Sequence, residues 1–397
     1  MIRRPPRSTL DRSSAASDVY KRQSLTSQVS IRGSVTGQTA IYVDPAVGMY
    51  VDGVYMGKAQ GSMFDVLDLE RVEVLRGPQG TLFGRNTLGG AISFITRKPT
   101  GEWDGSASVD IGNNNSHIEK LSLDLPKWGI ASVNLSARNE EAGGWMSNRN
   151  GKDEGSTDRQ SFRGALRLDL SSALTLDYAY DYSTIDETQT PSTLYSTSGS
   201  VGSISDLGNI LLGTGTRLGI PSLVQSGNFL LAAEPQMAPY VSRSRPGSMA
   251  SDTSNENVQR LNVDGQALTL SYELNETNTL KYIGSIRNMW VKDRVDMEGT
   301  PVELVKTGRN SHLDSSSHEI QWIGEAGRLN YVGGLYYYEE DGINVGGQLI
   351  MLSPPPANAK YVAYKVCLLY TSDAADERSS VDLGGRRIIK KKHSVSS

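Results

Sequence analysis

The sequence predicts a mainly β protein in which an N-terminal α/β domain precedes an incomplete antiparallel transmembrane β-barrel. Three observations predict this fold. Residues 24–100 mix short strands, turns and a candidate helix, whereas residues 101–365 repeat alternating segments of about ten residues each. The connections between these later segments alternate between short turns and long polar stretches. No apolar run reaches the roughly 18 residues of a membrane-spanning helix, so only strands could cross a membrane.

The composition fits this fold and excludes several classes of protein. Only 37% of residues are hydrophobic, as expected of barrel strands, because half of their residues face a polar lumen. The net charge of −4 shows no basic footprint, so nucleic acid is not an expected partner. The single cysteine, Cys367, excludes a disulfide framework and a cysteine-based metal site. We expect no metal site and no cofactor.

Both ends of the chain are expected not to be native. Residues 1–23 are basic and serine-rich, and they lack the apolar segment of a secretory signal peptide. Both they and residues 366–397 resemble translated sequencing-adapter sequence. The alternative is that both ends are genuine disordered tails, with Arg386, Arg387 and Lys390–Lys392 forming a basic arm.

The α/β domain is expected to contain a series of short strands. Asp52-Gly53 is a hairpin turn dipeptide, and Gly77-Pro78 ends a strand in which charged and apolar residues alternate. Ser62 is placed to cap a short helix over Met63–Leu67. The predicted strands cover Ile41–Asp44, Val47–Asp52, Glu70–Leu75 and Ala91–Thr96.

About nine alternating strands are expected between Gly105 and Glu340. Their apolar faces include Leu121–Leu125, Phe162–Leu170, Leu174–Tyr182, Leu268–Leu274 and Leu329–Tyr337. A soluble β-sandwich also alternates, but a structureless insertion of roughly 70 residues would be unusual in a compact soluble domain. That insertion is Thr184–Asn257, one of the long polar connections, which also include Asn139–Arg159 and Val291–Leu313. Short turns opposite long loops are typical of an outer-membrane barrel.

Tyrosines near the strand ends support the barrel interpretation. The odd number of predicted strands indicates that the barrel is incomplete. Tyr178, Tyr180 and Tyr182, with Tyr336–Tyr338, are expected in interfacial aromatic girdles. The alternative is ordinary packing within a sheet. Because bacterial single-chain barrels have even numbers of strands, an odd count predicts a truncated barrel.

Several motifs resemble the plug domain of TonB-dependent outer-membrane receptors. They are Ile31-Arg-Gly33, Val51-Asp-Gly-Val-Tyr55, the run LERVEVLRGPQGTLFGRN over Leu69–Asn86, and Gly89-Gly-Ala-Ile-Ser93. Downstream, Ser317–Gln321 and Tyr331–Tyr338 resemble barrel strands of the same family. The resemblance covers about residues 24–365. It divides them into a plug at 24–100 and the N-terminal part of the barrel at 101–365.

The resemblance implies a barrel of about 22 strands with a plugged lumen, of which about nine are present here. It also implies residence in the outer membrane of a Gram-negative bacterium, in contact with its lipid. The implied function is active uptake of a scarce solute, most commonly an iron–siderophore complex. TonB would supply the energy through an N-terminal box, and no such box is recognisable in this sequence. The alternative is a surface or secreted β-rich binding module, or a degenerate fragment, without transport activity.

The resemblance also implies which residues contact a ligand. By position, the apical plug loops are Tyr55–Gly61 and Phe83–Thr87. Lys58 and Arg85 would attract an anionic ligand such as a ferric siderophore, or would only solvate the loops. The candidate ligand contacts are Tyr55, Lys58, Gln60, Phe83, Arg85 and Asn86.

A second group of plug residues is expected to shape turns and latch the plug. Pro78 ends a strand, and the neighbouring glycines permit tight turns and positive φ. Arg76, with Arg71 as a second candidate, is expected to pair with carboxylates on the inner barrel wall. The alternative is that these arginines balance Glu70 and Glu73 on the strand surface. The glycines are Gly77, Gly80, Gly84, Gly89 and Gly90.

No catalytic constellation is evident, so we do not expect an enzyme. Gly53–Lys58 resembles a phosphate-binding loop, but its spacing is one residue short and no Ser or Thr follows the lysine. The group His312, Asp314, His318 and Glu319 lacks a third histidine and fits a polar surface better than a metal site.

Overall fold

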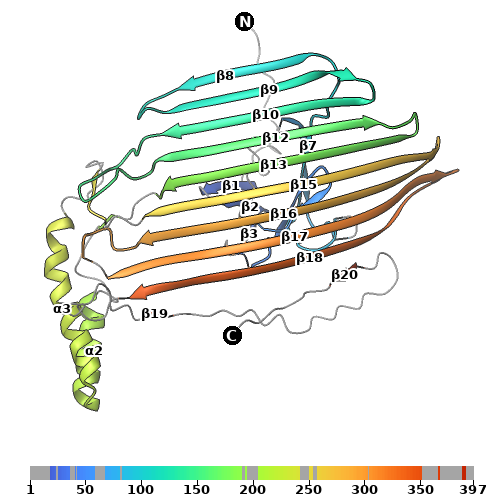
Figure 1. Ribbon diagram of the computed structural model, residues 1–397. Helices are drawn as coiled ribbons and strands as arrows, with labels where there is room; N and C mark the ends of the chain where they lie inside the picture. Colours follow the sequence, from blue (N-terminus) through green and yellow to red (C-terminus); the bar gives the residue numbers. More distant parts are fainter. Residues whose placement is uncertain are drawn as a thin grey trace, which may run out of the picture.

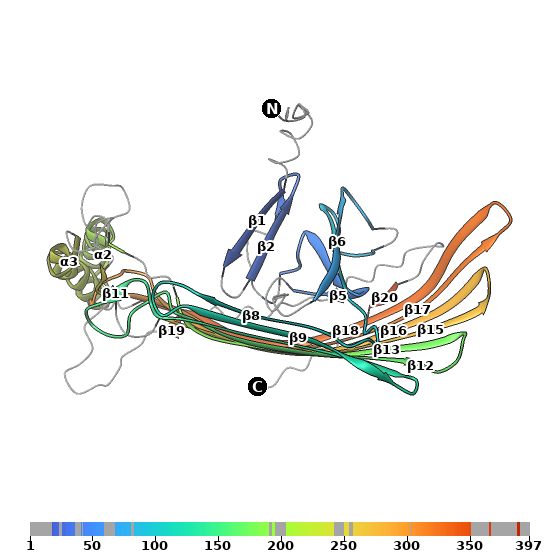
Figure 2. The ribbon, with the colours of Figure 1, turned by 90° about the horizontal axis from the view of Figure 1, so that it is seen from above.

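The computed structural model describes residues 18–23, 26–35, 41, 43–58, 68–80, 83–189, 193–194, 204–241, 250–253, 257–302, 304–350, 365–366 and 387–389. Its largest part is a long, curved antiparallel sheet (Figure 1). A smaller N-terminal domain lies against the concave face of this sheet, and a helical hairpin lies beyond one end of its strands (Figure 2). The concave face is therefore the inner face of a barrel wall.

Nine long strands form the wall, in agreement with the predicted number. Each is antiparallel to the next, from β8 at one edge to β18 near the other. Among the described residues β8 and β18 do not pair, so the sheet is not closed; β18 instead pairs with the short β19 (Lys365–Val366) and β20 (Arg387–Ile389). The nine are β8 (Asp104–Ile111), β9 (His117–Trp128), β10 (Ala131–Ala142), β12 (Thr157–Asp169), β13 (Leu174–Thr188), β15 (Val258–Asn275), β16 (Asn278–Asp296), β17 (Val305–Ala326) and β18 (Leu329–Ile350).

The outer face of the wall changes character along the strands. Near the short turns, Tyr272, Leu280 and Trp322 lie directly opposite one another and are 44%, 40% and 53% exposed. Farther toward the long connections, Asp264 and Asp314 share this face with Asn288 in cross-strand register. The apolar band expected to face lipid therefore covers the short-turn end of the strands, and the strands continue beyond it.

The expectation of a structureless connection over Thr184–Asn257 is wrong. Strand β13 continues to Thr188, and the connection then contains helices α2 (Ile204–Leu218) and α3 (Pro221–Val241). It also contains β14 (Ala250–Ser251), which pairs with β11 (Ser147–Asn148) from another connection. Proline and glycine are poor helix formers, and α3 contains Pro235 and Pro239 while α2 contains several glycines. The local sequence therefore did not predict this helical hairpin. Among the described residues, no helix is long and apolar enough to cross a membrane.

The N-terminal domain contains two small sheets. One has the order β5-β4-β7-β6, formed by β4 (Val47–Val51), β5 (Val54–Met56), β6 (Leu69–Arg76) and β7 (Gly90–Thr96). The strands predicted over 47–52, 70–75 and 91–96 and the Asp52-Gly53 hairpin are confirmed, with φ of 49° and 88° at the two turn residues. The helix expected after Ser62 lies outside the described residues. The other sheet contains β1 (Asp18–Gln23), β2 (Thr26–Ile31) and β3 (Ser34–Val35). Because β1 lies within residues 1–23, the boundary at residue 23 stays a prediction.

The strand expected over Ile41–Asp44 is wrong, because Ile41 has another role. It lies in a turn, and its side chain is only 6% exposed. It joins a hydrophobic cluster on the inner wall formed by Ile185, Leu261, Val263, Met289, Val291 and Leu313. Burial against the wall, rather than pairing with a strand, fixes this segment.

The two faces of the β4–β5 hairpin both contact the wall. Met49, Val51, Val54 and Met56 form one cluster with Ile283 of β16. Tyr50, Tyr55 and Ala91 form another with Tyr338 of β18, against which Tyr336 also packs. The girdle prediction is therefore wrong for Tyr336 and Tyr338, which face the plug.

Candidate plug–wall site

The residues predicted to contact ligand gather where the N-terminal domain meets β18. Tyr55 is the middle residue of strand β5, and Lys58 follows that strand. Phe83, Arg85 and Asn86 come from the turn before β7. Gln60 lies outside the described residues. The structure thus brings five of the six candidates to one place, from two loops far apart in sequence.

Lys58 is the ionic centre of this group. Its ammonium lies 2.8 Å from Asp44 Oδ1 and 2.9 Å from Glu340 Oε1 on the wall. The Lys58 side chain is 5% exposed and that of Glu340 is 11% exposed. Burial alone would raise the pKa of Asp44, but Lys58 and Arg85 together outweigh it and hold the pKa below its ordinary value. Lys58 is therefore clamped between a carboxylate of its own domain and one of the wall.

Arg85 lies between two tyrosine rings. Its guanidinium carbon is 4.7 Å from the centre of the Tyr338 ring and 5.7 Å from that of Tyr55, within cation–π range. Its Nη1 is 3.9 Å from Asp44 Oδ2, whereas its buried Nη2 has no hydrogen-bond partner among the described residues. Asn86, at a φ of 61°, donates from Nδ2 to the Tyr55 hydroxyl at 2.7 Å. Burial raises the pKa of Tyr55 to about 12, so this hydroxyl stays protonated.

Aromatic rings and a close backbone approach complete the contact. The Phe83 ring lies 5.0 Å from that of Tyr50, whose hydroxyl donates to the Phe83 carbonyl at 2.6 Å. At Gly57 an added Cβ would lie 2.4 Å from the Tyr338 hydroxyl, so only glycine fits there without movement. The site as a whole is a closed interface between the plug and the wall.

A second ionic contact joins the plug to strand β12 of the wall, and sequence reasoning missed it. Arg163 of β12 is 6% exposed and places Nη2 3.3 Å from Asp52 Oδ2 and 3.2 Å from Thr96 Oγ1. Lys98 then lies 3.7 Å from Asp52 and 4.0 Å from Asp177, which also binds Arg167 in a forked pair. A cavity of about 20 Å³ lies beside these groups. The available signals were an Asp-Gly turn and charges alternating along a strand, which indicate local structure only.

The predicted latch residues lie elsewhere. Arg71 is 52% exposed and pairs with Glu70 at 2.6 Å and Glu73 at 2.8 Å, which is the alternative stated for it above. Arg76 is also exposed, at the end of β6. Pro78 follows directly after that strand and its Gly77. A latch role for the two arginines therefore stays a prediction.

The glycines of the turn region differ from one another. Gly77, Gly84 and Gly90 have φ of 88°, 76° and 153°, values that favour glycine. Gly80 and Gly89 do not have positive φ. At Gly89 space is the constraint, because an added Cβ would lie 2.7 Å from Ser34 Cβ.

Within the described residues, no group of three or more His, Cys, Asp and Glu side chains is arranged to hold a metal ion. His312 and Asp314 contact each other at 3.1 Å on an exposed surface, and both are about half exposed. His318 accepts or donates a hydrogen bond with the Tyr282 hydroxyl at 2.8 Å. The first contact lies within β17 and the second joins β17 to β16, both on the outer face of the sheet.

Comparison with known proteins agrees with this architecture. Residues 7–91 match the family model of the TonB-dependent Receptor Plug Domain. The pesticin receptor of Yersinia enterocolitica is 35% identical over 102 residues, which cover 26% of this chain and 15% of that protein. An iron-regulated outer membrane virulence protein of Vibrio cholerae is 37% identical over 119 residues, covering 28% of this chain and 18% of that protein. The chain thus spans a small part of the length of these relatives.

Solved structures extend the likeness to the wall. The ferric yersiniabactin uptake receptor of Yersinia pestis matches with a TM-score of 0.63 at 18% identity, over 85% of this chain and 46% of that one. The siderophore receptor PiuA of Acinetobacter baumannii matches with a TM-score of 0.60 at 12% identity, over 96% of this chain and 49% of that one. A plug with this family's sequence therefore lies against a sheet with this family's fold. The chain therefore carries the plug domain of the TonB-dependent receptors of the outer membrane of Gram-negative bacteria, followed by nine strands that have the fold of their barrel sheet.

Proposed function

We propose that this chain is part of a receptor that imports an iron–siderophore complex across the outer membrane, driven by TonB. The observation that carries the proposal is a plug seated on the inner face of the wall by ion pairs and hydrogen bonds as well as by apolar clusters. Salt bridges and hydrogen bonds exchange with water during a movement. A plug held in this way can leave the wall and return to it.

The matched relatives support the choice of solute. They include receptors named for ferrioxamine B in Salmonella typhimurium and for ferrienterobactin in Escherichia coli, at 38% and 34% identity over 71 and 86 residues. These short matches cover only 10% and 12% of those proteins, so they do not indicate which siderophore this chain takes. An iron–siderophore complex is accordingly proposed as a class, without a particular member.

The candidate ligand residues divide into two roles in this proposal. Arg85 retains a hydrogen-bond donor without an acceptor, and Tyr55, Phe83 and Asn86 surround it with aromatic and amide groups. These four, together with Gln60, are proposed ligand contacts once the plug loops are displaced. Lys58 is proposed as an anchor, because drawing it toward a ligand would leave two carboxylates without their cation.

The inner wall beyond the plug is lined with paired charges, which suits a solvated path. Arg138 pairs with Glu140 at 2.7 Å, and Arg309 pairs with Asp293. Arg159 and Glu187 form a further pair on the same face. Paired charges present a polar surface with little net potential, so a large hydrated complex can pass without being trapped.

The test requires the complete reading frame, obtained by sequencing through both ends of the locus. The encoded protein is expressed in a Gram-negative host that lacks its own siderophore receptors, with and without TonB. Cells are then given radioactive iron as ferrioxamine B, ferric enterobactin or ferric yersiniabactin. The proposal expects TonB-dependent accumulation with at least one of these complexes. Surface binding without accumulation in the TonB-containing host would support a binding module instead, and neither binding nor accumulation would contradict an iron–siderophore receptor.

A further inference from the structure

Three wall connections meet at the long-loop end of the sheet through buried polar side chains. They are the β10–β12 connection (residues 143–156), the end of the β13–β15 connection (residues 250–257) and the β16–β17 connection (residues 297–304). Eight of their polar residues, or of the strand residues beside them, are at most 9% exposed: Asn148, Glu154, Asp252, Thr253, Asn257, Asp296, Glu298 and Thr300. We call this group the rim cluster. Buried polar groups at the ends of loops are unusual, because loops normally lie in water.

The first two connections are joined by side chains and by a short parallel strand pair. Asn148 donates from Nδ2 to the carbonyl of Thr253 at 3.3 Å and to its hydroxyl at 3.2 Å. Glu154 accepts from the Thr253 hydroxyl and, at 2.6 Å, from Asn257 Nδ2. Arg149 adds an ion pair with Asp252 at 2.7 Å.

The third connection is attached through Asn257 and Asp296. The Asn257 side-chain oxygen accepts from the Asp296 amide at 2.6 Å. Asp296 in turn accepts from the amides of Glu298 and Gly299, each at 3.1 Å, and Glu298 accepts from the Leu304 amide at 2.8 Å. Asn257 therefore links all three connections with one side chain.

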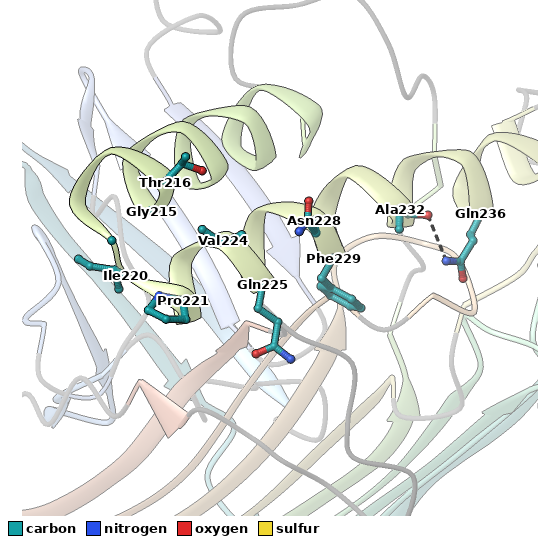
Figure 3. Close-up of a pocket in the computed structure, with 11 residues that line it drawn as sticks. Gly215, Thr216, Ile220, Pro221, Val224, Gln225, Asn228, Phe229, Ala232 and Gln236 are labelled. Atoms are coloured by element: carbon teal, nitrogen blue, oxygen red, sulfur yellow. Dashed lines mark hydrogen bonds between the residues drawn. The ribbon is translucent and has the colours of Figure 1, made fainter.

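Helix α3 is then fixed to the third connection by apolar contacts. Leu230, Ala233 and Met237 of α3 are 4%, 1% and 1% exposed and form a cluster with Leu304 and Val302. Beyond this base, the hairpin carries an open groove of about 1000 Å³. Figure 3 shows Ile220, Pro221, Val224, Gln225 and Phe229 along it, and its full lining is uncharged.

We infer that the α2–α3 hairpin is a fixed arm of the wall rather than a hinged lid. Swinging the hairpin would expose the apolar base of α3, or would move the third connection with it and break the hydrogen bonds of Asn257 and Glu298 that hold this connection. Each buried polar group left without its partner costs about 1–3 kcal/mol, so such a swing is opposed by several contacts at once. The arm holds its groove at a constant position relative to the barrel mouth, whatever the plug does.

The test measures the position of the arm directly. In the full-length receptor with its native cysteines replaced by serine, nitroxide labels are placed at Ile210→Cys on α2, which is 63% exposed, and at Asn310→Cys on the exposed face of β17. Pulsed electron spin resonance should give one narrow distance distribution. A broad or bimodal distribution in this parent protein would overturn the inference.

A second measurement uses the variant Asn257→Leu, because this change removes the side chain that links all three connections. It should broaden the distance distribution and accelerate amide exchange in residues 226–237 by about tenfold. The matched control is Asn262→Leu, which changes an exposed asparagine on the following strand, β15, and should leave both measurements unchanged. Retained heat-modifiable gel mobility shows that each variant has folded. A folded Asn257→Leu protein with unchanged distances and exchange would also overturn the inference, and neither measurement requires a ligand.

Discussion

The ammonium of Lys58 lies 2.9 Å from Glu340 Oε1, and this ion pair joins the loop after β5 to the middle of β18. Both side chains are largely buried. Because Lys58 also binds Asp44 at 2.8 Å, one cation holds two carboxylates that would otherwise repel each other. Lys58 therefore couples the plug loops to the wall electrostatically.

Removing the wall carboxylate should loosen the plug. In Glu340→Gln, Lys58 keeps Asp44 but loses its partner on β18, and Tyr338 loses a charged acceptor at 2.7 Å. We expect the free energy of plug opening to fall by about 2 kcal/mol, less than for a fully orphaned charge, because one carboxylate remains. The rate of amide hydrogen exchange in β4 and β5 measures the free energy of plug opening. Glu339→Gln, on the opposite face of the same strand, is the control, and an equal effect of both changes would argue against the anchor.

The ionic contact between Arg163 and Asp52 can be tested by a substitution that leaves the backbone conformation unchanged. Asp52 has a φ of 49°, which asparagine tolerates well, so Asp52→Asn removes charge without adding strain. The loss of the charged contacts to Arg163 and Lys98 should lower the free energy of plug opening by about 1–3 kcal/mol. Asp52→Ala should cost more, because it adds backbone strain to the loss of charge. Equal exchange rates in wild type and Asp52→Asn would show that the ionic contact does not hold the plug.

The close approach at Gly57 predicts a specific rescue. In Gly57→Ala, the new Cβ would lie 2.4 Å from the Tyr338 hydroxyl, and relieving this overlap should cost about 1–3 kcal/mol of plug docking. Adding Tyr338→Phe removes the overlapping oxygen and should recover part of the loss, as amide exchange of β5 would show. Gly213→Ala in α2, with nothing within 4 Å of the added Cβ, should leave docking unchanged. A double variant as loose as Gly57→Ala alone would refute the predicted overlap.

Plug docking should weaken in acid through Asp44. Its pKa in the docked state is held below the ordinary value of 3.8, so Asp44 stabilises docking above that pH and this contribution is lost as pH falls through the lowered pKa. Other carboxylates titrate in the same range, so the informative quantity is the difference between wild type and Asp44→Asn. Below about pH 4 that difference should shrink toward zero. A difference that stays constant between neutral and acid pH would contradict the depressed pKa.

The sequence predicted the fold well where local pattern and tertiary structure agree. Alternation along Leu174–Tyr182 and Leu268–Leu274 predicted strands β13 and β15, and Asp52-Gly53 predicted its hairpin. It failed where a distant surface decides the conformation. Ile41 lies in a turn because a hydrophobic cluster on the wall receives it. Helix α3, with two internal prolines, is held by the β16–β17 connection rather than by its own propensity.

The sequence grouped the candidate residues, but it did not show what they contact. The sequence placed Tyr55, Lys58 and Arg85 in neighbouring loops, but only the fold shows that β18 closes over them. Arg163 could not be assigned from its strand, because alternating charges occur on any half-buried strand. Which distant residues meet depends on the register of the strands and the curvature of the sheet, and neither can be predicted from one segment of the sequence.

One measurement tests the central claim that Lys58 anchors the plug. Cells expressing the complete receptor, as wild type or as Lys58→Met, are compared for growth inhibition by vancomycin and for surface affinity toward the ferric siderophore that wild type imports. Lys152→Met, on an exposed connection, is the control. An anchoring Lys58 predicts increased sensitivity to vancomycin, because the loosened plug opens the lumen, with affinity unchanged. Reduced affinity with unchanged sensitivity would contradict the anchor and make Lys58 a ligand contact.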